Sequence, residues 1–201
     1  MPVSPRVKSY AEKDNVERII DTFATKEDPT LADLEAVGIV AQVESQLDRY
    51  RMNASEMEAK KIRDEVHESK RMAEYLALDG DPRPHSKAHA HAIVSGGHKE
   101  AARARAIMAW LKVRIDDPDN GCWLPENTAA IAEMPLYLRK AVPHSRIHRF
   151  NYYFWLNREI TRRKTPNSTK LREVLRMIEL RLQSGSQPGY VMNKKGVGLP
   201  G

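Results

Sequence analysis

The sequence predicts a mainly α-helical protein with one small β-hairpin, and three observations support this fold class. Apolar residues recur at helical spacing over much of the chain, for example at Val16, Ile19, Ile20 and Phe23. One short β-compatible segment lies between breaker residues, and a second follows an Asn-Gly pair, which is typical of a tight turn. With 201 residues, of which 41% are hydrophobic and 30% charged, the chain can bury one core and has a globular composition.

Residues 1–80 are expected to form three helices, of which the first carries the apolar face just described. Thr30 and Asp33 have the spacing of an N-cap for the second helix, and Ser55 and Glu58 that of a capping box for the third. The apolar faces of the second and third helices are Val40, Val43, Leu47, Tyr50, Ile62, Val66, Ala73 and Leu76. Since no pattern here indicates chemistry, we expect a helical docking or delivery region.

The run Asp79–Pro84, with its turn and breaker residues, is the predicted domain boundary. Residues 1–80 carry 12 Lys and Arg against 17 Asp and Glu, whereas residues 81–201 carry 21 against 10. Such a difference is expected where one region approaches a polyanion, although a solvated basic surface without a partner is an equal alternative. We therefore divide the chain into residues 1–80, a second domain over 81–185 and a flexible tail over 186–201.

Beyond this boundary, the two expected strands are residues 88–94 and 122–124, and a helix is predicted between them over 98–114. Pro143 suits the first position of another helix, which is expected to continue to about Arg163. The apolar face of a final amphipathic helix is Leu171, Val174, Leu175, Ile178 and Leu182.

Cys122 is the only cysteine of the chain. A single thiol allows no intrachain disulfide and no zinc site built from cysteines. Because free cysteine is among the most buried residue types, Cys122 is interpreted as a small core residue rather than a nucleophile.

Histidines give the strongest indication of chemistry. His144 and His148 are four residues apart on a predicted helix, so both imidazoles would project from one face. Such a pair is more often an ordinary surface or core feature, but His91 on a predicted strand supplies a third imidazole. Three imidazoles can hold one divalent metal ion and leave a position open for water or substrate. Imidazole suits zinc or nickel and magnesium prefers oxygen ligands, so the residues do not decide among Mg, Zn and Ni.

Five segments of the second domain follow one another in a recognisable order. They are Ala90–Val94, Asp119–Gly121, Trp123–Pro125, His144–His148 and Asn151–Tyr153. Together they resemble the AHH nucleases, which belong to the HNH/endonuclease VII superfamily. The resemblance covers about a third of the chain and implies a ββα-metal (His-Me finger) nuclease module, preceded here by the helical N-terminal region.

The resemblance also implies a role for each matching residue. His91, His144 and His148 would be the metal ligands, and Asn120 would orient the general base. The base itself, the second histidine of the motif, should stand where this chain has Ala92.

Moving the motif to His89 does not restore the base, because alanine follows that histidine too. The resemblance therefore implies a chain that lost its activity naturally or was deliberately inactivated by a His-to-Ala change at position 92. The survival of the other motif residues favours the second explanation.

Arg146, Arg149 and Arg158 lie on or near the predicted metal helix, where they could contact nucleic-acid phosphates. For each of them, ordinary surface charge is the alternative interpretation. The aromatic run 152–155 could stack on bases, but such a run on a helix is more often part of the core.

By resemblance, the expected function is that of a metal-dependent endonuclease toxin, an interbacterial effector that hydrolyses the DNA of a target cell. An RNase on the same fold and a catalytically dead nucleic-acid-binding module are the alternatives. The expected partners are DNA or RNA and an acidic immunity protein, whose charge would complement the basic domain. Residues 1–80 could also bind a delivery chaperone or a secretion-system component.

The N-terminal stretch lacks the apolar segment of a Sec signal peptide, and no apolar run approaches the length of a membrane span. We therefore expect synthesis in the bacterial cytoplasm, export by another route and action in the cytoplasm of the target cell.

Overall fold

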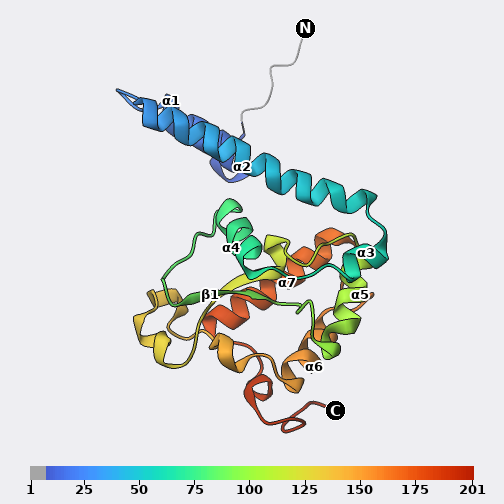
Figure 1. Ribbon diagram of the computed structural model, residues 1–201. Coiled ribbons are helices and arrows are strands. Elements are labelled where there is room, and N and C mark those ends of the chain that lie inside the picture. Colours follow the sequence, from blue (N-terminus) through green and yellow to red (C-terminus); the bar gives the residue numbers. More distant parts are fainter. Residues whose placement is uncertain (1–7) are drawn as a thin grey trace.

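Figure 1 shows the computed structural model, which describes residues 8–201. The protein is mainly helical and contains a two-stranded antiparallel sheet, so the predicted fold class is confirmed. The first seven residues, on which the expectation about a signal peptide partly rests, lie outside the described part of the chain. Within that part, no helix has both the length and the apolar character needed to cross a membrane.

The first two α-helices form an arm that projects from the rest of the molecule (Figure 1). In this arm, α1 (Asn15–Ala24) packs against α2 (Leu31–Glu56). The predicted N-cap of α2 is confirmed, because the Thr30 hydroxyl accepts a hydrogen bond from the Asp33 backbone N–H. Buried residues of α2 lie only toward its C-terminal end, where it joins the body of the protein: Leu47, Tyr50 and Ala54.

The single helix expected to begin at Ser55 and continue past Leu76 is wrong. The Ser55 hydroxyl caps no helix and instead donates to the carbonyl oxygen of Met52 within α2, at 2.7 Å. Two shorter helices follow, α3 (Ala59–Arg63) and α4 (Ser69–Leu78).

The segment between α3 and α4 is drawn out of helical geometry by a buried carboxylate. Asp116, which is fully buried, accepts hydrogen bonds from His67 Nδ1 at 2.5 Å and from the Glu68 backbone N–H at 3.1 Å. Val66, which was expected on the apolar face, is 74% exposed as a result. A buried acceptor that needs donors thus overrides the local helix preference.

α4 belongs to the body of the protein rather than to the arm. Its residues Met72 and Leu76 are buried in the main core. A Cβ added to Gly121 would lie only 3.1 to 3.2 Å from these two side chains, which shows how closely α4 packs on the hairpin. The packing thus joins α4 to the residues that follow it, across the boundary expected at residue 80.

The two predicted strands are confirmed with slightly different ends. β1 (Ala88–Ala92) pairs antiparallel with β2 (Gly121–Pro125), and His91 lies opposite Cys122. The helix predicted between them is shorter than expected: it is α5 (Ala102–Trp110). It ends there because Lys112 takes a left-handed backbone conformation with φ of 59°.

The helix predicted from Pro143 to Arg163 is wrong at its start. A short 3-10 helix, η6 (His144–Arg146), is separate from α6 (Phe150–Glu159). Ile147 is fully buried, and Arg149 has an extended backbone with φ of −126° and ψ of 159°, so the chain changes direction between the two helices. His144 and His148 therefore do not share a helix face.

The final amphipathic helix is confirmed as α7 (Ser168–Ser184), which packs against β2. Gly185 ends α7 with φ of +69°, and a Cβ there would collide with the backbone oxygen of Lys140. Cys122 is a core residue, as expected, and so are three of the four residues of the aromatic run, whereas Phe154 is half-buried. The largest buried side chains are Trp123, Trp155, Tyr152 and Tyr153. The remaining short 3-10 helices are η1 (Tyr10–Glu12), η2 (Lys99–Ala101), η3 (Pro118–Asn120), η4 (Ala129–Glu133) and η5 (Leu136–Leu138).

The C-terminal tail, which was expected to be flexible, is held against α6. The Asn151 side-chain amide donates to the backbone oxygens of Tyr190 at 2.8 Å and Lys194 at 3.1 Å. Its oxygen accepts from the Gly196 backbone N–H at 2.9 Å. Within η7 (Gly189–Met192), Val191 is fully buried, so one buried side chain and one amide anchor the tail.

Candidate metal centre

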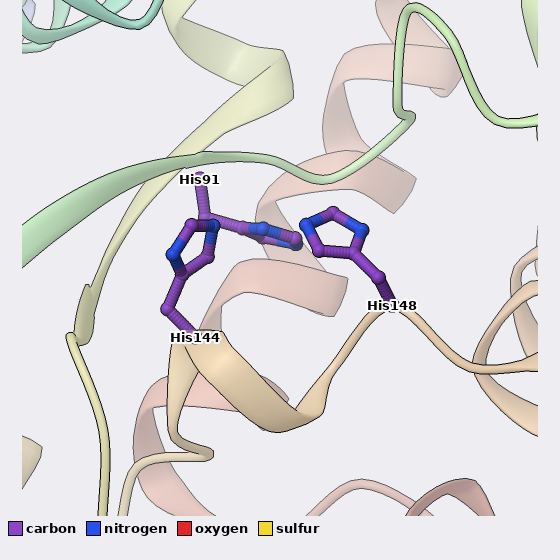
Figure 2. Close-up of side chains that lie close together, drawn as sticks. All are labelled: His91, His144 and His148. Carbon is purple, nitrogen blue, oxygen red and sulfur yellow. The ribbon is translucent and has the colours of Figure 1, made fainter.

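Three histidines from distant parts of the chain come together beside the hairpin (Figure 2). His91 lies on β1, His144 on η6 and His148 just before α6. Each offers one ring nitrogen, and these three atoms lie within 4.8 Å of one another. The structure thus brings together all three of the predicted ligands, although two of them come from a bent segment rather than from one helix.

His91 has the environment of a preorganised ligand. Its Nε2 lies 3.1 Å from the Tyr152 hydroxyl, and that hydroxyl donates to the backbone oxygen of Ile93 at 2.7 Å. Since the hydroxyl proton is already used, Nε2 must carry the ring proton and donate it to Tyr152. The lone pair of Nδ1 is then free, and among the described residues this buried atom has no hydrogen-bond partner.

A buried acceptor without a partner is unfavourable, so the free Nδ1 of His91 requires an explanation. Burial lowers the pKa of His91 well below its ordinary value, and the neighbouring charges of His148 and His144 add to this effect. The ring is therefore neutral at physiological pH, and its lone pair is available to a metal cation.

His144 and His148 complete the cluster as neutral rings. Burial lowers the pKa of His144 to about 4, with smaller contributions from the charges of His148 and His89. Burial also lowers the pKa of His148, assisted by His98. The Nδ1 atom of His148 lies 2.8 Å from the Tyr153 hydroxyl, which leaves Nε2 as the ligand atom.

This set of donors fits one divalent cation. Three neutral imidazoles supply three nitrogen ligands and leave a position for water or substrate. Tyr152 and Tyr153 hold two of the rings through the nitrogen that faces away from the cluster, as partners of metal ligands commonly do.

Position 92 faces away from these histidines. Directly opposed residues of an antiparallel pair share one face, so Ala92 lies on the side of Gly121, toward Met72 and Leu76 of α4. Adjacent strand residues point to opposite faces, which puts His91 on the other side. Because Ala92 is a core residue with only 5% exposure, the packing suits a small side chain at the expected position of the general base.

Asn120 is fully buried and holds the turn that follows β1. Its side-chain oxygen accepts from the Val94 backbone N–H at 2.8 Å, and its amide donates to the backbone oxygens of Val94 and Ile115. Its own backbone oxygen accepts from the Ile93 N–H at 2.8 Å. Asn120 therefore orders the segment that adjoins the metal centre, and its side-chain bonds go to the backbone.

The three arginines that were expected to contact phosphates lie in different surroundings. Arg146 is exposed on η6, beside two of the histidines. Arg149 donates to the backbone oxygen of Met192 and so helps to hold the C-terminal tail. Arg158 is placed over the ring of Phe154 on α6, with 5.7 Å between its guanidinium carbon and the ring centroid. Only Arg146 combines exposure with a place next to the cluster.

Sequence reasoning missed the two tyrosines that orient the ligands. Tyr152 and Tyr153 stand next to each other in an aromatic run, and their burial was anticipated. Their hydroxyl contacts were not, because they depend on how α6 packs against β1. The spacing of five residues between His148 and its partner Tyr153 gives no signal of its own, because α6 begins only at Phe150.

Comparison with known families agrees with this geometry. Residues 72–181 match the family described as AHH, a nuclease family of the HNH/ENDO VII superfamily with conserved AHH. The match spans more than half of the chain and begins within α4, in agreement with the packing of that helix on the hairpin. No curated protein and no solved structure gives a match.

Proposed function

Because this chain belongs to the AHH family of nucleases, within the HNH/ENDO VII superfamily, we propose that it is an endonuclease that hydrolyses the phosphodiester bonds of DNA. Nucleases of this superfamily use a divalent metal ion, and the residues that would hold it here are His91, His144 and His148. The observation that supports this assignment best is the buried and unpaired Nδ1 of His91 at the centre of the cluster.

When bound, a divalent ion would supply charge stabilisation at the scissile phosphate and at the leaving oxygen. The protein's own residues bind and position the reacting groups. Tyr152 fixes the tautomer of His91, and Tyr153 fixes the ring of His148. Asn120 keeps the backbone after β1 in one conformation. These contacts hold the ligand atoms in place before substrate arrives, which reduces the reorganisation needed during the reaction.

The charge of the chain suits a polyanionic substrate. Residues 81–201 carry 21 Lys and Arg against 10 Asp and Glu, and this region contains the whole histidine cluster. Arg146 is exposed next to the cluster and is the arginine best placed to contact a phosphate. Arg149 and Arg158 would contribute to the general field rather than to a defined contact.

We propose further that the nuclease is an interbacterial toxin. In this proposal the arm formed by α1 and α2 serves delivery, through a chaperone or a secretion-system component, and the toxin acts in the cytoplasm of the target cell. Support comes from the projection of the arm (Figure 1) and from its exposed apolar side chains, such as Leu31 at 72% and Ile39 at 61% exposure. A large exposed apolar surface is typical of a site that binds another protein.

An acidic immunity protein is the partner that this toxin would require in the producing cell. The basic surface that attracts DNA would also attract such an inhibitor and accelerate its association. Co-expression of a neighbouring acidic protein should protect cells that make the toxin, and the association rate should fall as salt is added. If no neighbouring acidic protein protects cells that make the active nuclease, the toxin proposal fails.

The test of the nuclease proposal uses the full chain with plasmid DNA and with structured RNA, after chelation and after addition of Mg²⁺, Zn²⁺ or Ni²⁺. Cleavage is expected only with added metal and should disappear in the His91→Ala variant. If RNA is cut and DNA is not, the substrate is RNA. A catalytically dead binding module would instead bind both nucleic acids and cut neither of them, whichever metal ion is added.

A further inference from the structure

The proposed hydrolysis needs a group that removes a proton from the attacking water, and position 92 does not supply one. We propose that His67, from the segment between α3 and α4, is the general base of this chain, with Asp116 as the residue that positions it. This inference rests on the proposed nuclease function. His67 lies outside residues 72–181, the part that matches the family, so it would be a feature of this chain rather than of the shared motif.

His67 and Asp116 form a hydrogen-bonded pair. The Nδ1 atom of His67 lies 2.5 Å from Asp116 Oδ1, and Asp116 is fully buried. The other carboxylate oxygen accepts from Arg71 Nε at 2.8 Å and from the Glu68 N–H at 3.1 Å. Because Asp116 accepts a hydrogen bond from Nδ1–H, the proton of the neutral His67 ring is on Nδ1 and the lone pair is on Nε2. This is the tautomer that a general base requires.

The His67 side chain borders solvent-accessible space beside β1. The His67 side chain is 24% exposed and lines a cavity of about 530 Å³ with Gly96 and Gly97, which follow β1. Arg63 and Arg105 lie on the wall of the same cavity together with Asp64 and Glu65, and Arg63 is paired with Asp64 at 2.7 Å. A base here is therefore reachable by water and by a phosphodiester.

Ser69 lies between His67 and a second cavity. The Ser69 hydroxyl lies 3.3 Å from His67 Nε2. Ser69 also lines a cavity of about 400 Å³ whose wall includes His144, one of the proposed ligands. His67 is therefore one residue contact away from the space next to the cluster.

His67 also lies close to the end of β1, just before α4. His67 further packs against the loop after β1, since a Cβ on Gly96 would lie 3.0 Å from its own Cβ. An imidazole from the preceding segment therefore lies near the end of β1, where the strand carries alanine.

The electrostatics of the cluster are consistent with this proximity. A charge on His67 contributes to the lowered pKa values of all three proposed ligands, His91, His144 and His148, although burial is the main cause in each case. This effect agrees with a position of His67 on the same side of the molecule as the cluster.

The chemical step is balanced without any further reagent. Nε2 of His67 takes one proton from a water molecule, and the water oxygen forms a bond to phosphorus. The bond between phosphorus and the leaving sugar oxygen then breaks, and that oxygen acquires a proton from solvent. The proton on His67 returns to solvent afterwards, so the base is regenerated.

The alternative is that His67 only anchors the segment between α3 and α4. That role needs Nδ1 alone, so a side chain that keeps the Nδ1 hydrogen bond and lacks Nε2 separates the two possibilities. Asparagine does so, because its amide nitrogen can donate to Asp116 but has no atom at the position of Nε2. The variant His67→Asn therefore tests catalysis while it preserves the anchor, and His67→Ala with added imidazole provides a second test.

The experiment measures plasmid cleavage and Zn²⁺ binding for the parent, His67→Asn, His67→Ala and the control His85→Ala. His85 is a half-buried histidine outside the cluster, so its loss should change neither quantity. Loss of a general base is expected to lower the cleavage rate by about 10²–10⁴-fold in both His67 variants, with Zn²⁺ binding retained. Imidazole in the buffer should restore part of the rate of His67→Ala, and only of that variant.

Each of the other results has a defined meaning. If His67→Asn cuts at the parental rate, the assignment of His67 is overturned. If the parent is inert and Ala92→His cuts DNA, the base belongs at position 92, and the nuclease proposal stands without His67. If neither the parent nor Ala92→His cuts any nucleic acid with any of the metals, the nuclease proposal and the assignment of His67 both fail.

Discussion

Two polar clusters of the molecule differ in how their groups are satisfied. In the histidine cluster only His91 is buried, whereas both members of the carboxylate cluster, Asp117 and Asp119 just before β2, are buried. Asp117 and Asp119 each have side chains only 2% exposed, and Arg172 lies 2.6 Å from both. Arg176 adds a contact of 2.5 Å to Asp119. Although burial alone would raise the pKa of Asp117, Arg172 and Arg51 hold it below its ordinary value.

The histidine cluster has no such internal compensation. The buried Nδ1 of His91 has no hydrogen-bond partner among the described residues, and the rings around it are also bases. A cluster whose charges and hydrogen bonds are matched within the protein contributes to the fold. A cluster that leaves imidazole lone pairs converging on one point is suited to binding an external cation. The comparison therefore assigns stability to the first cluster and binding to the second, and each of the following predictions tests that division.

The largest effect is expected on activity when a proposed ligand is removed. His144→Ala should lose several kcal/mol of transition-state stabilisation, which corresponds to about 10³-fold in the rate of plasmid cleavage. In the metal-free protein, the same change should alter the free energy of unfolding by less than about 1 kcal/mol, because the half-buried ring makes few structural contacts. A large loss of stability without metal would mean that the cluster is structural after all.

A substitution in the carboxylate cluster should have the opposite profile. Asp119→Ala leaves Arg172 and Arg176 without their shared partner and is expected to cost about 3 kcal/mol of folding stability, near the low end for a buried pair because the arginines are partly exposed. Urea unfolding would measure this loss. The folded fraction should still bind Zn²⁺ as tightly as the parent, so weaker binding would indicate that the two clusters are coupled.

A smaller effect is expected from the residue that sets the tautomer of His91. Tyr152→Phe removes the acceptor for the Nε2 proton, and the affinity for Zn²⁺ should fall by about 10–100-fold. The exposed Tyr137 offers a matched control, since Tyr137→Phe removes a hydroxyl far from any ligand. Equal affinities in the two variants would show that Tyr152 does not orient the ring.

The smallest effect concerns the dependence of stability on pH. The pKa of His144 is about 4 in the folded protein, below the ordinary value of 6.5, so the unfolded chain binds a proton that the folded chain excludes. The contribution of this group to stability is therefore complete above about pH 6.5 and is lost as the pH falls toward about 4. In the metal-free protein, His144→Ala should flatten the stability profile in this window. An unchanged slope would show that other groups account for it.

The elements of the fold could be predicted from the sequence where a local pattern decided the structure. The two strands were predicted from their β-compatible residues, and α7 from its apolar face. The tight turn expected at Asn120-Gly121 is wrong, because Gly121 has an extended backbone with φ of −106° and begins β2. The segments that were predicted wrongly are those where a distant group decides the structure. Asp116 lies 48 residues from Glu68 and draws its backbone out of a helix, and no local pattern reveals such a bond.

The candidate site shows the same limit. The grouping of His91, His144 and His148 was anticipated, but the reason given for the last two, a shared helix face, was wrong. The buried Ile147 bends the chain, and tertiary packing restores the proximity of the rings. The pairing of His67 with Asp116 could not be predicted either, because the two residues are 49 positions apart in the sequence.

The measurement that tests the central claim most directly is the stoichiometry of divalent metal binding by the metal-free chain, determined by titration calorimetry with Zn²⁺, Ni²⁺ and Mg²⁺. The parent and His85→Ala should each bind one ion per chain, whereas the variant that carries His91→Ala, His144→Ala and His148→Ala should bind none. Stoichiometric binding by the triple variant, or the absence of binding by the parent with all three metals, would contradict the assignment of the histidine cluster as the metal centre.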